Sequence, residues 1–286
     1  MAQRYRTRQR CPGHHVHPAS LELVSRRWGE AGPQLLLLHG LGDGSFVWNA
    51  FLRPLAHLSC VAVDLRGHGD SPWDPHGDYR PAAHVADVLN VIRRMRLTDF
   101  TLMGHSLGAD IAIHVAAKES ARIRRLILVD GGPDLDHRAA LALRQQMHVL
   151  PRRFGSIEQF EQALAARHPL ANPDVLREYA RCALRYTPED DFALKFDAAV
   201  LPTGAAPDPA PLRDALRSVQ CPKLIVRGAV SSFLSRPRAV QLCDSLENCT
   251  LATVPRAGHS VALDNPSGLR DAVTLFLSAA SPSLRA

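Results

Sequence analysis

The chain has 286 residues, of which 46% are hydrophobic and 22% charged, a balance typical of one folded domain with or without an insertion. The formal net charge is +6, but no basic run is interleaved with aromatic residues, so we expect no nucleic-acid partner. The longest aliphatic run, Leu35–Leu38, is too short to span a bilayer, so we expect no membrane partner.

The termini and the cysteines indicate a compartment. The N-terminus is positively charged but has no apolar h-region, which argues against a signal peptide. The six cysteines have spacings typical neither of a zinc site nor of a disulfide framework. From these features we expect a cytoplasmic protein with reduced thiols, and we expect neither a metal nor a cofactor.

Short apolar runs alternate with helical patterns along much of the chain. The first run, residues 21–24, predicts an antiparallel edge strand. The buried strands that we expect next are residues 35–38, 61–65, 100–103, 126–129, 224–226 and 250–254, with helices at 81–96, at 107–118 and after Asn265-Pro266. Because these strands lack strict polar alternation, they indicate a parallel sheet that is covered on both faces. The order of strands and helices predicts a doubly wound α/β fold.

The strand pattern stops after Val129 and resumes at Leu224. Residues 133–217 hold only helical patterns, with a capping box at Ser156 and Gln159 and a second helix start at Asn172. We expect this all-helical insertion to cap the carboxyl edge of the sheet, where open α/β sheets bind ligands. The predicted organisation is a core at 1–132, including an N-terminal extension at 1–18, a cap at 133–217, and the rest of the core at 218–286.

One short motif carries the candidate nucleophile. Gly104-His105-Ser106-Leu107-Gly108 fits the pattern G-x-S-x-G and lies between a predicted strand and a predicted helix. A turn this tight forces its serine into a strained backbone conformation, and the flanking glycines let strand and helix approach without Cβ clashes. The turn lifts the Ser106 hydroxyl clear of the sheet.

A second turn follows the strand at 35–38. Its glycines would aim the backbone N–H of Leu41 at the same point as the N–H of Leu107, which makes these two amides the candidate oxyanion hole. The neighbouring residues that we expect to contact substrate are Gly40, Gly42, Asp43 and His105.

His259 is the candidate general base. It lies in the loop after the last predicted strand, far from Ser106 in sequence. In open parallel sheets such loops gather at the same edge as the nucleophile turn, and the order nucleophile, acid, base is the usual one for this motif.

Taken together, these segments resemble the α/β-hydrolase family from about residue 21 to residue 277. The segments that carry the resemblance are HGLGDGSFVW (39–48), VAVDLRGHGDSPW (61–73), LMGHSLG (102–108), LILVDGGP (126–133) and PRAGHSVALDNP (255–266). The resemblance implies an eight-stranded, mostly parallel sheet with a helical cap between the sixth and seventh strands. It also implies Ser106 as nucleophile, His259 as base, and the amides of Leu41 and Leu107 as oxyanion donors.

The acid departs from the family pattern. The family usually places it shortly after a glycine that follows the post-cap strand, and here both expected positions are serine, Ser231 and Ser232. The best substitute is Asp130, at the end of the strand at 126–129, a place where some family members carry their acid. Two alternatives stay open: Asp130 braces a turn while no carboxylate completes the site, or Asp264 supplies the acid, although it more naturally supports the loop after His259.

The nucleophile type narrows the chemistry. Family members that are dehalogenases or epoxide hydrolases use aspartate at this turn, whereas a serine implies an acyl-enzyme. We therefore expect a serine hydrolase that cleaves a small-molecule carboxylic ester, thioester or lactone. The alternatives are a cofactor-free oxygenase or other non-hydrolytic enzyme that uses a His259–Asp130 pair, and a ligand-binding relative with vestigial catalysis.

Overall fold

The computed structural model describes residues 14–16, 22–29, 34–55, 58–201 and 208–279. Its main sheet has eight strands in the order β1-β2-β4-β3-β5-β6-β10-β11. Their bounds are β1 His14–Val16, β2 Ser25–Trp28, β3 Leu35–Leu38, β4 Cys60–Val63, β5 Phe100–His105, β6 Ile123–Val129, β10 Lys223–Gly228 and β11 Cys249–Val254. Strand β2 pairs antiparallel with β1 and β4, and every pair from β4 to β11 is parallel.

This sheet confirms the prediction of an eight-stranded, mostly parallel α/β fold. The expected edge strand at residues 21–24 is wrong in position, because the antiparallel strand begins at Ser25 and β1 lies outside it at the edge. Leu23 and Val24 are buried just before β2, and the Val24 carbonyl oxygen accepts the Asp64 N–H at 2.8 Å beside the β2–β4 ladder.

Helices cover both faces of the sheet, as the apolar runs require. Leu35 and Leu37 pack in one core cluster with α1 (Asn49–Leu52) and α10 (Pro266–Ser278). Leu36 and Leu38 pack in the other, which contains residues of α2 (Pro81–Arg94), α3 (Leu107–Lys118), α7 (Ala210–Ser218) and α8 (Arg236–Asp244). Because successive side chains of a strand point to opposite faces, four consecutive leucines fill both layers.

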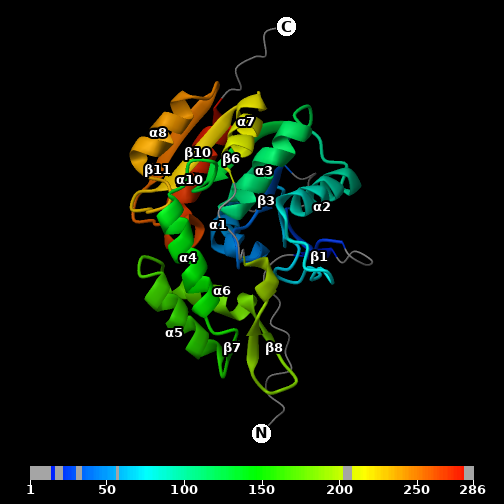
Figure 1. The fold of residues 1–286 in the computed structure, drawn as a ribbon, viewed down its shortest axis with the longest axis vertical. Coiled ribbons are helices and arrows are strands. Elements are labelled where there is room, and N and C mark those ends of the chain that lie inside the picture. Colours follow the sequence, from blue (N-terminus) through cyan, green and yellow to red (C-terminus); the bar gives the residue numbers. More distant parts are fainter. Residues whose placement is uncertain (1–13, 17–21, 30–33, 56–57, 202–207, 280–286) are drawn as a thin grey trace.

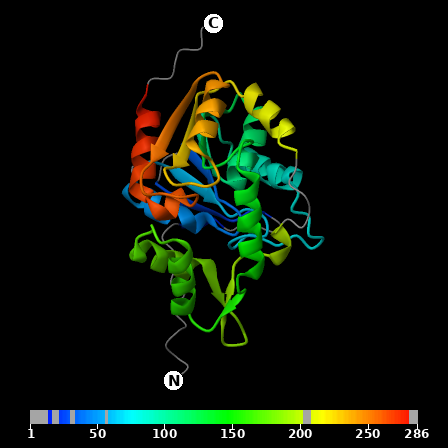
Figure 2. The same cartoon turned by 60° about the vertical axis from the view of Figure 1, so that its left-hand side comes forward.

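The insertion between β6 and β10 contains α4 (His137–Val149), β7 (Arg153–Phe154), α5 (Ile157–Arg167), α6 (Pro173–Ala183), β8 (Leu184–Tyr186), β9 (Phe192–Leu194), η3 (Ala198–Val200) and α7. In Figures 1 and 2 the elements from β7 to β9 gather at one end of the molecule, and the green helix α4 runs toward them from the level of the sheet. The expectation of an all-helical insertion is wrong, because β7, β9 and β8 form an antiparallel sheet. These strands have only two or three residues each, too few for a periodic sequence pattern to emerge.

The predicted helix starts in the insertion are confirmed. The Ser156 hydroxyl accepts a hydrogen bond from the Gln159 N–H, and the Asn172 side chain accepts one from the Asp174 N–H. These contacts satisfy backbone donors that no intrahelical carbonyl reaches.

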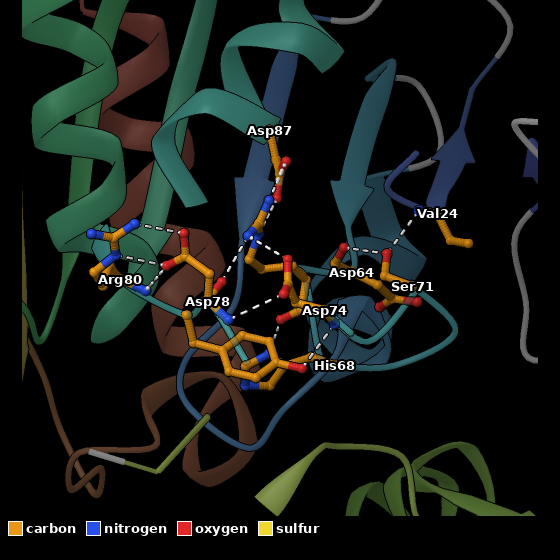
Figure 3. Close-up of polar contacts among 10 residues, drawn as sticks. Val24, Asp64, His68, Ser71, Asp74, Asp78, Arg80 and Asp87 are labelled. Atoms are coloured by element: carbon orange, nitrogen blue, oxygen red, sulfur yellow. Dashed lines mark hydrogen bonds and ion pairs between the residues drawn. The ribbon is translucent and has the colours of Figure 1, made fainter. Parts of the chain in front are cut away.

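The loop after β4 makes hydrogen bonds both within itself and to the insertion. Within it, Ser71 donates to the Asp64 carbonyl oxygen, and Asp74 accepts backbone N–H groups of the same loop (Figure 3). The Tyr79 hydroxyl accepts from the Asp74 N–H at 3.0 Å and donates to Asp197 of the insertion at 2.6 Å. The loop is thus braced internally and holds one end of the insertion.

None of the described helices is long and apolar enough to cross a bilayer. Of the described cysteines, Cys60, Cys221, Cys243 and Cys249 are free thiols.

Candidate active site

Ser106 lies in the turn between β5 and α3, with φ 51° and ψ −117°. This is the strained conformation that the motif predicts, and a glycine on each side makes it possible. A Cβ on Gly104 would lie 2.1 Å from the Gly108 carbonyl oxygen, and a Cβ on Gly108 would lie 2.4 Å from the Leu38 carbonyl oxygen. Only glycine permits this close approach of β5, α3 and the end of β3.

The structure brings Ser106, His259 and Asp130 into one chain of hydrogen bonds. The Nε2 atom of His259 lies 3.0 Å from the Ser106 Oγ atom, and its Nδ1 atom lies 2.8 Å from the Asp130 Oδ2 atom. Asp130 directly follows β6, has φ 43° and is fully buried. The imidazole is therefore placed to exchange a proton with the serine while the carboxylate holds its other nitrogen.

Three neighbours fix the His259 loop. The Phe233 ring stacks on the imidazole with ring centroids 3.8 Å apart. His105 donates from Nε2 to the His259 carbonyl oxygen at 2.8 Å, and burial lowers the pKa of His105 to about 3, so this side chain is neutral. Asp264 accepts the Gly258 N–H at 2.8 Å, which is the loop-supporting contact that we expected of it.

The two serines at the usual acid positions differ. Ser232 is exposed, whereas Ser231 is buried with its Oγ atom 2.6 Å from the Asp130 Oδ2 atom. Neither serine makes a hydrogen bond to the His259 ring among the described contacts.

The candidate oxyanion turn is fixed by His39. This buried ring donates from Nδ1 to the Gly40 carbonyl oxygen at 2.8 Å and accepts the Leu65 N–H at Nε2. Burial lowers the pKa of His39 well below its usual value, which keeps the ring neutral. Leu107 is the first residue of α3, so its N–H has no acceptor within the helix. The assignment of Leu41 and Leu107 as oxyanion donors stays a prediction.

Two cavities lie at this edge of the sheet. The inner chamber has a volume of about 80 Å³ and is lined by Ser106 together with the predicted pocket residues Gly40, Leu41, Gly42, Asp43 and His105. The outer cavity has a volume of about 680 Å³. Side chains that border both cavities, among them His259, Arg167 and His168, mark the junction between them.

The insertion supplies polar residues that sequence reasoning missed. Tyr179 on α6 donates to Asp43 at 2.7 Å; burial raises the pKa of Asp43 to about 6, and this hydrogen bond opposes the rise. Arg167, at the end of α5, donates to the Met147 sulfur at 3.4 Å, and its charge also opposes the rise in the pKa of Asp43. Burial lowers the pKa of His168 to about 4. No motif marks these positions, because an arginine in a last helical turn usually only complements the helix dipole.

Comparisons with known proteins agree with this architecture. Residues 35–272 match the model of the alpha/beta hydrolase family. The chain is 31% identical over 254 residues to 2-(acetamidomethylene)succinate hydrolase of Mesorhizobium japonicum, covering 87% of this chain and 89% of that protein. It is 29% identical to esterase Rv0045c of Mycobacterium tuberculosis, over 86% of this chain and 83% of that one. A crystal structure of E-2-(acetamidomethylene)succinate hydrolase superposes with a TM-score of 0.81 at 28% identity, covering 90% of this chain and 95% of the other. This chain therefore belongs to the alpha/beta hydrolase family.

Proposed function

We propose that the protein is a serine hydrolase that cleaves a carboxylic ester, or a related thioester or lactone, through an acyl-enzyme. The observation that carries this proposal is the alignment of the Ser106 hydroxyl, the His259 ring and the Asp130 carboxylate at 3.0 Å and 2.8 Å. The hydrolase and esterase names of the relatives support the same reaction class.

In the proposed mechanism the Ser106 oxygen attacks the substrate carbonyl while His259 takes the hydroxyl proton at Nε2. The N–H groups of Leu41 and Leu107 stabilise the oxyanion of the tetrahedral intermediate. His259 then gives its proton to the leaving group, and an acyl-Ser106 ester remains. His259 next activates a water that releases the acid and regenerates the hydroxyl. Asp130 accepts a hydrogen bond from the Nδ1–H group throughout, without taking the proton, and stabilises the imidazolium.

The cavities favour a substrate with unequal ends. The inner chamber of about 80 Å³ next to Ser106 fits only a short group, whereas the outer cavity of about 680 Å³ beside His259 fits a much longer one. We therefore propose that one of the two groups that flank the scissile bond is small.

Arg167 favours a substrate that carries a carboxylate. Arg167 borders both cavities and makes no ion pair with a described carboxylate, although its charge acts on the buried Asp43 in the inner chamber and lowers the pKa of that carboxyl. Arginine binds carboxylates through two parallel N–H groups. The name of the Mesorhizobium relative states a succinate derivative as its substrate, and on both grounds we extend the proposal to an anionic acyl compound.

The anion preference has its own test. We expect Arg167→Gln to raise KM for the 4-nitrophenyl monoester of succinate by about 10-fold or more, because a charge-assisted pair is lost, and to leave KM for 4-nitrophenyl butyrate within about twofold. Arg181→Gln is the matched control, because Arg181 is exposed on α6. Equal effects of Arg167→Gln on both esters would contradict the anion preference.

The nucleophile is tested with Ser106→Ala. We expect this change to lower turnover of 4-nitrophenyl acetate by at least about 10³-fold and to abolish covalent labelling by a fluorophosphonate probe. Equal labelling or equal turnover of both proteins would refute the proposal. Metal-free oxygen consumption that survives Ser106→Ala would favour the cofactor-free oxygenase instead.

A further inference from the structure

The candidate acid is held by a strand that does not carry it. Asp130 follows β6, but two of its hydrogen bonds come from β10 and the turn after it. The Gly228 N–H donates to the Asp130 Oδ1 atom at 3.2 Å, and the Ser231 hydroxyl lies 2.6 Å from the Asp130 Oδ2 atom. The same turn also carries Phe233, whose ring stacks on His259. Residues 228–234, here called the β10 turn, therefore contact both members of the acid–base pair.

The direction of the Ser231 hydrogen bond follows from its other contacts. The Ser231 Oγ atom accepts the N–H groups of Phe233 at 3.1 Å and of Leu234 at 3.4 Å. A hydroxyl has two acceptor positions and one proton. Since both acceptor positions are used, the proton is directed at the remaining partner, the Asp130 carboxylate.

This donor changes what the carboxylate can do. The terminal torsion of an aspartate is soft, so a carboxylate with a single partner turns readily. Here the Oδ2 atom accepts hydrogen bonds from His259 Nδ1 and from the Ser231 hydroxyl, while the Oδ1 atom accepts one from the Gly228 N–H. The three contacts leave one orientation, in which Oδ2 faces the imidazole. They also stabilise a negative charge that has no access to water.

We propose that Ser231 is a positioning residue for the reaction: its hydroxyl fixes and stabilises the Asp130 carboxylate, and through it the imidazole of His259. The inference rests on the proposed function, in which Asp130 orients His259. Serine at this position thus supports an acid that is supplied by the neighbouring strand, and it does not replace that acid at the imidazole.

The first experiment compares Ser231→Ala with Ser232→Ala, a matched change at the adjacent exposed serine. We expect Ser231→Ala to lower kcat for 4-nitrophenyl acetate by about 10-fold to 100-fold, the effect of losing a hydrogen bond to a charged group. We expect KM to change little, because Ser231 lines neither cavity. The thermal midpoint should fall by a few degrees, because the buried N–H groups of Phe233 and Leu234 lose their acceptor, so kcat is compared at a temperature where both proteins are folded. Ser232→Ala should keep the wild-type rate. A wild-type kcat in Ser231→Ala would overturn the proposal.

A double-mutant cycle with Asp130→Asn separates positioning from a general structural effect. If Ser231 acts through the carboxylate, adding Ser231→Ala to Asp130→Asn should lower the rate by no more than about twofold. If the added change still costs its full factor, Ser231 does not act through Asp130 and the proposal fails. The rate of fluorophosphonate labelling, followed over hours, measures the slow variants.

Failure of this inference and failure of the proposed function give different results. If Ser106→Ala retains labelling and turnover, the proposed function fails, whatever Ser231→Ala does. If Ser106→Ala is inactive and Ser231→Ala matches the wild type, only the role of Ser231 is refuted.

Discussion

Replacing Asp130 by asparagine tests the acid directly, because every group that contacts this carboxylate is a donor. The Oδ1 atom accepts from the Gly228 N–H, and the Oδ2 atom accepts from His259 Nδ1 and Ser231 Oγ. Asparagine offers one acceptor and one NH2 group, so neither orientation of its amide satisfies all three partners.

The two orientations have different consequences. With the amide oxygen facing His259, the NH2 group meets the Gly228 N–H, and two buried donors in contact cost about 1–3 kcal/mol. With the NH2 group facing His259, the imidazole moves its proton to Nε2, and that tautomer cannot accept the Ser106 proton. In that orientation the NH2 group also meets the Ser231 hydroxyl, but a hydroxyl can rotate its proton away whereas the Gly228 N–H is fixed, so we expect the second orientation to predominate. The kcat should then fall by about 10⁴-fold, which corresponds to about 5.5 kcal/mol of lost transition-state stabilisation.

The assay is the steady-state hydrolysis of 4-nitrophenyl acetate, with circular dichroism as a check on folding. Asp264→Asn is the matched control, because Asp264 ends the short helix α9 (Val261–Asp264) that follows His259, and it accepts a hydrogen bond from the Gly258 N–H. We expect this control to stay within about tenfold of the wild-type rate. A folded Asp130→Asn protein with a wild-type rate, and a large loss in Asp264→Asn, would refute the reasoning and assign the acid to Asp264.

Three further predictions concern the surroundings of the site. Phe233→Leu removes the ring that stacks on His259 and should lower kcat/KM by about 2-fold to 10-fold; an unchanged kcat/KM would contradict this role. Gly108→Ala places a Cβ 2.4 Å from the Leu38 carbonyl oxygen and should lower the urea-unfolding free energy by about 1–3 kcal/mol or more, so a wild-type urea midpoint would argue against this tight packing. Burial raises the pKa of Asp110 from 3.8 to about 7, so the folded state binds this proton more tightly and loses stability as pH rises from about 4 to 7. Asp110→Asn should therefore unfold at higher urea than the wild type at pH 8, by on the order of 2 kcal/mol, and show little difference at pH 4; an equal gap at both pH values would be inconsistent with the ionisation.

Local patterns predicted much of the fold. The helix at 107–118 and the strand at 35–38 have the predicted bounds, because a glycine-flanked turn and a continuous leucine run leave little choice of structure. The helix after Asn265-Pro266 likewise begins at Pro266, where the cap and the proline coincide. The short strands of the insertion were missed because their pairing depends on contacts between separate segments.

The same distinction applies to the site. The motif around Ser106 and the loop of His259 are visible in the sequence, and the chain order alone suggests that they meet. Ser231 and Asp130 are 101 positions apart in the sequence, so no local sequence pattern predicts their hydrogen bond. Arg167 is equally hidden, because the packing of α5 against its neighbours decides that its side chain borders the cavities.

The walls of the inner chamber come from two different stretches of chain. Leu41, Ser106 and His259 are carried by strand ends and loops of the main sheet, whereas Met147, Phe160 and Tyr179 belong to the insertion. On the proposed function, the reacting groups all belong to the core, whereas the insertion supplies part of the chamber lining. We therefore expect mutations in α4, α5 and α6 to alter substrate selectivity while the reacting atoms stay in place, which makes the insertion the natural region to randomise when altered selectivity is sought.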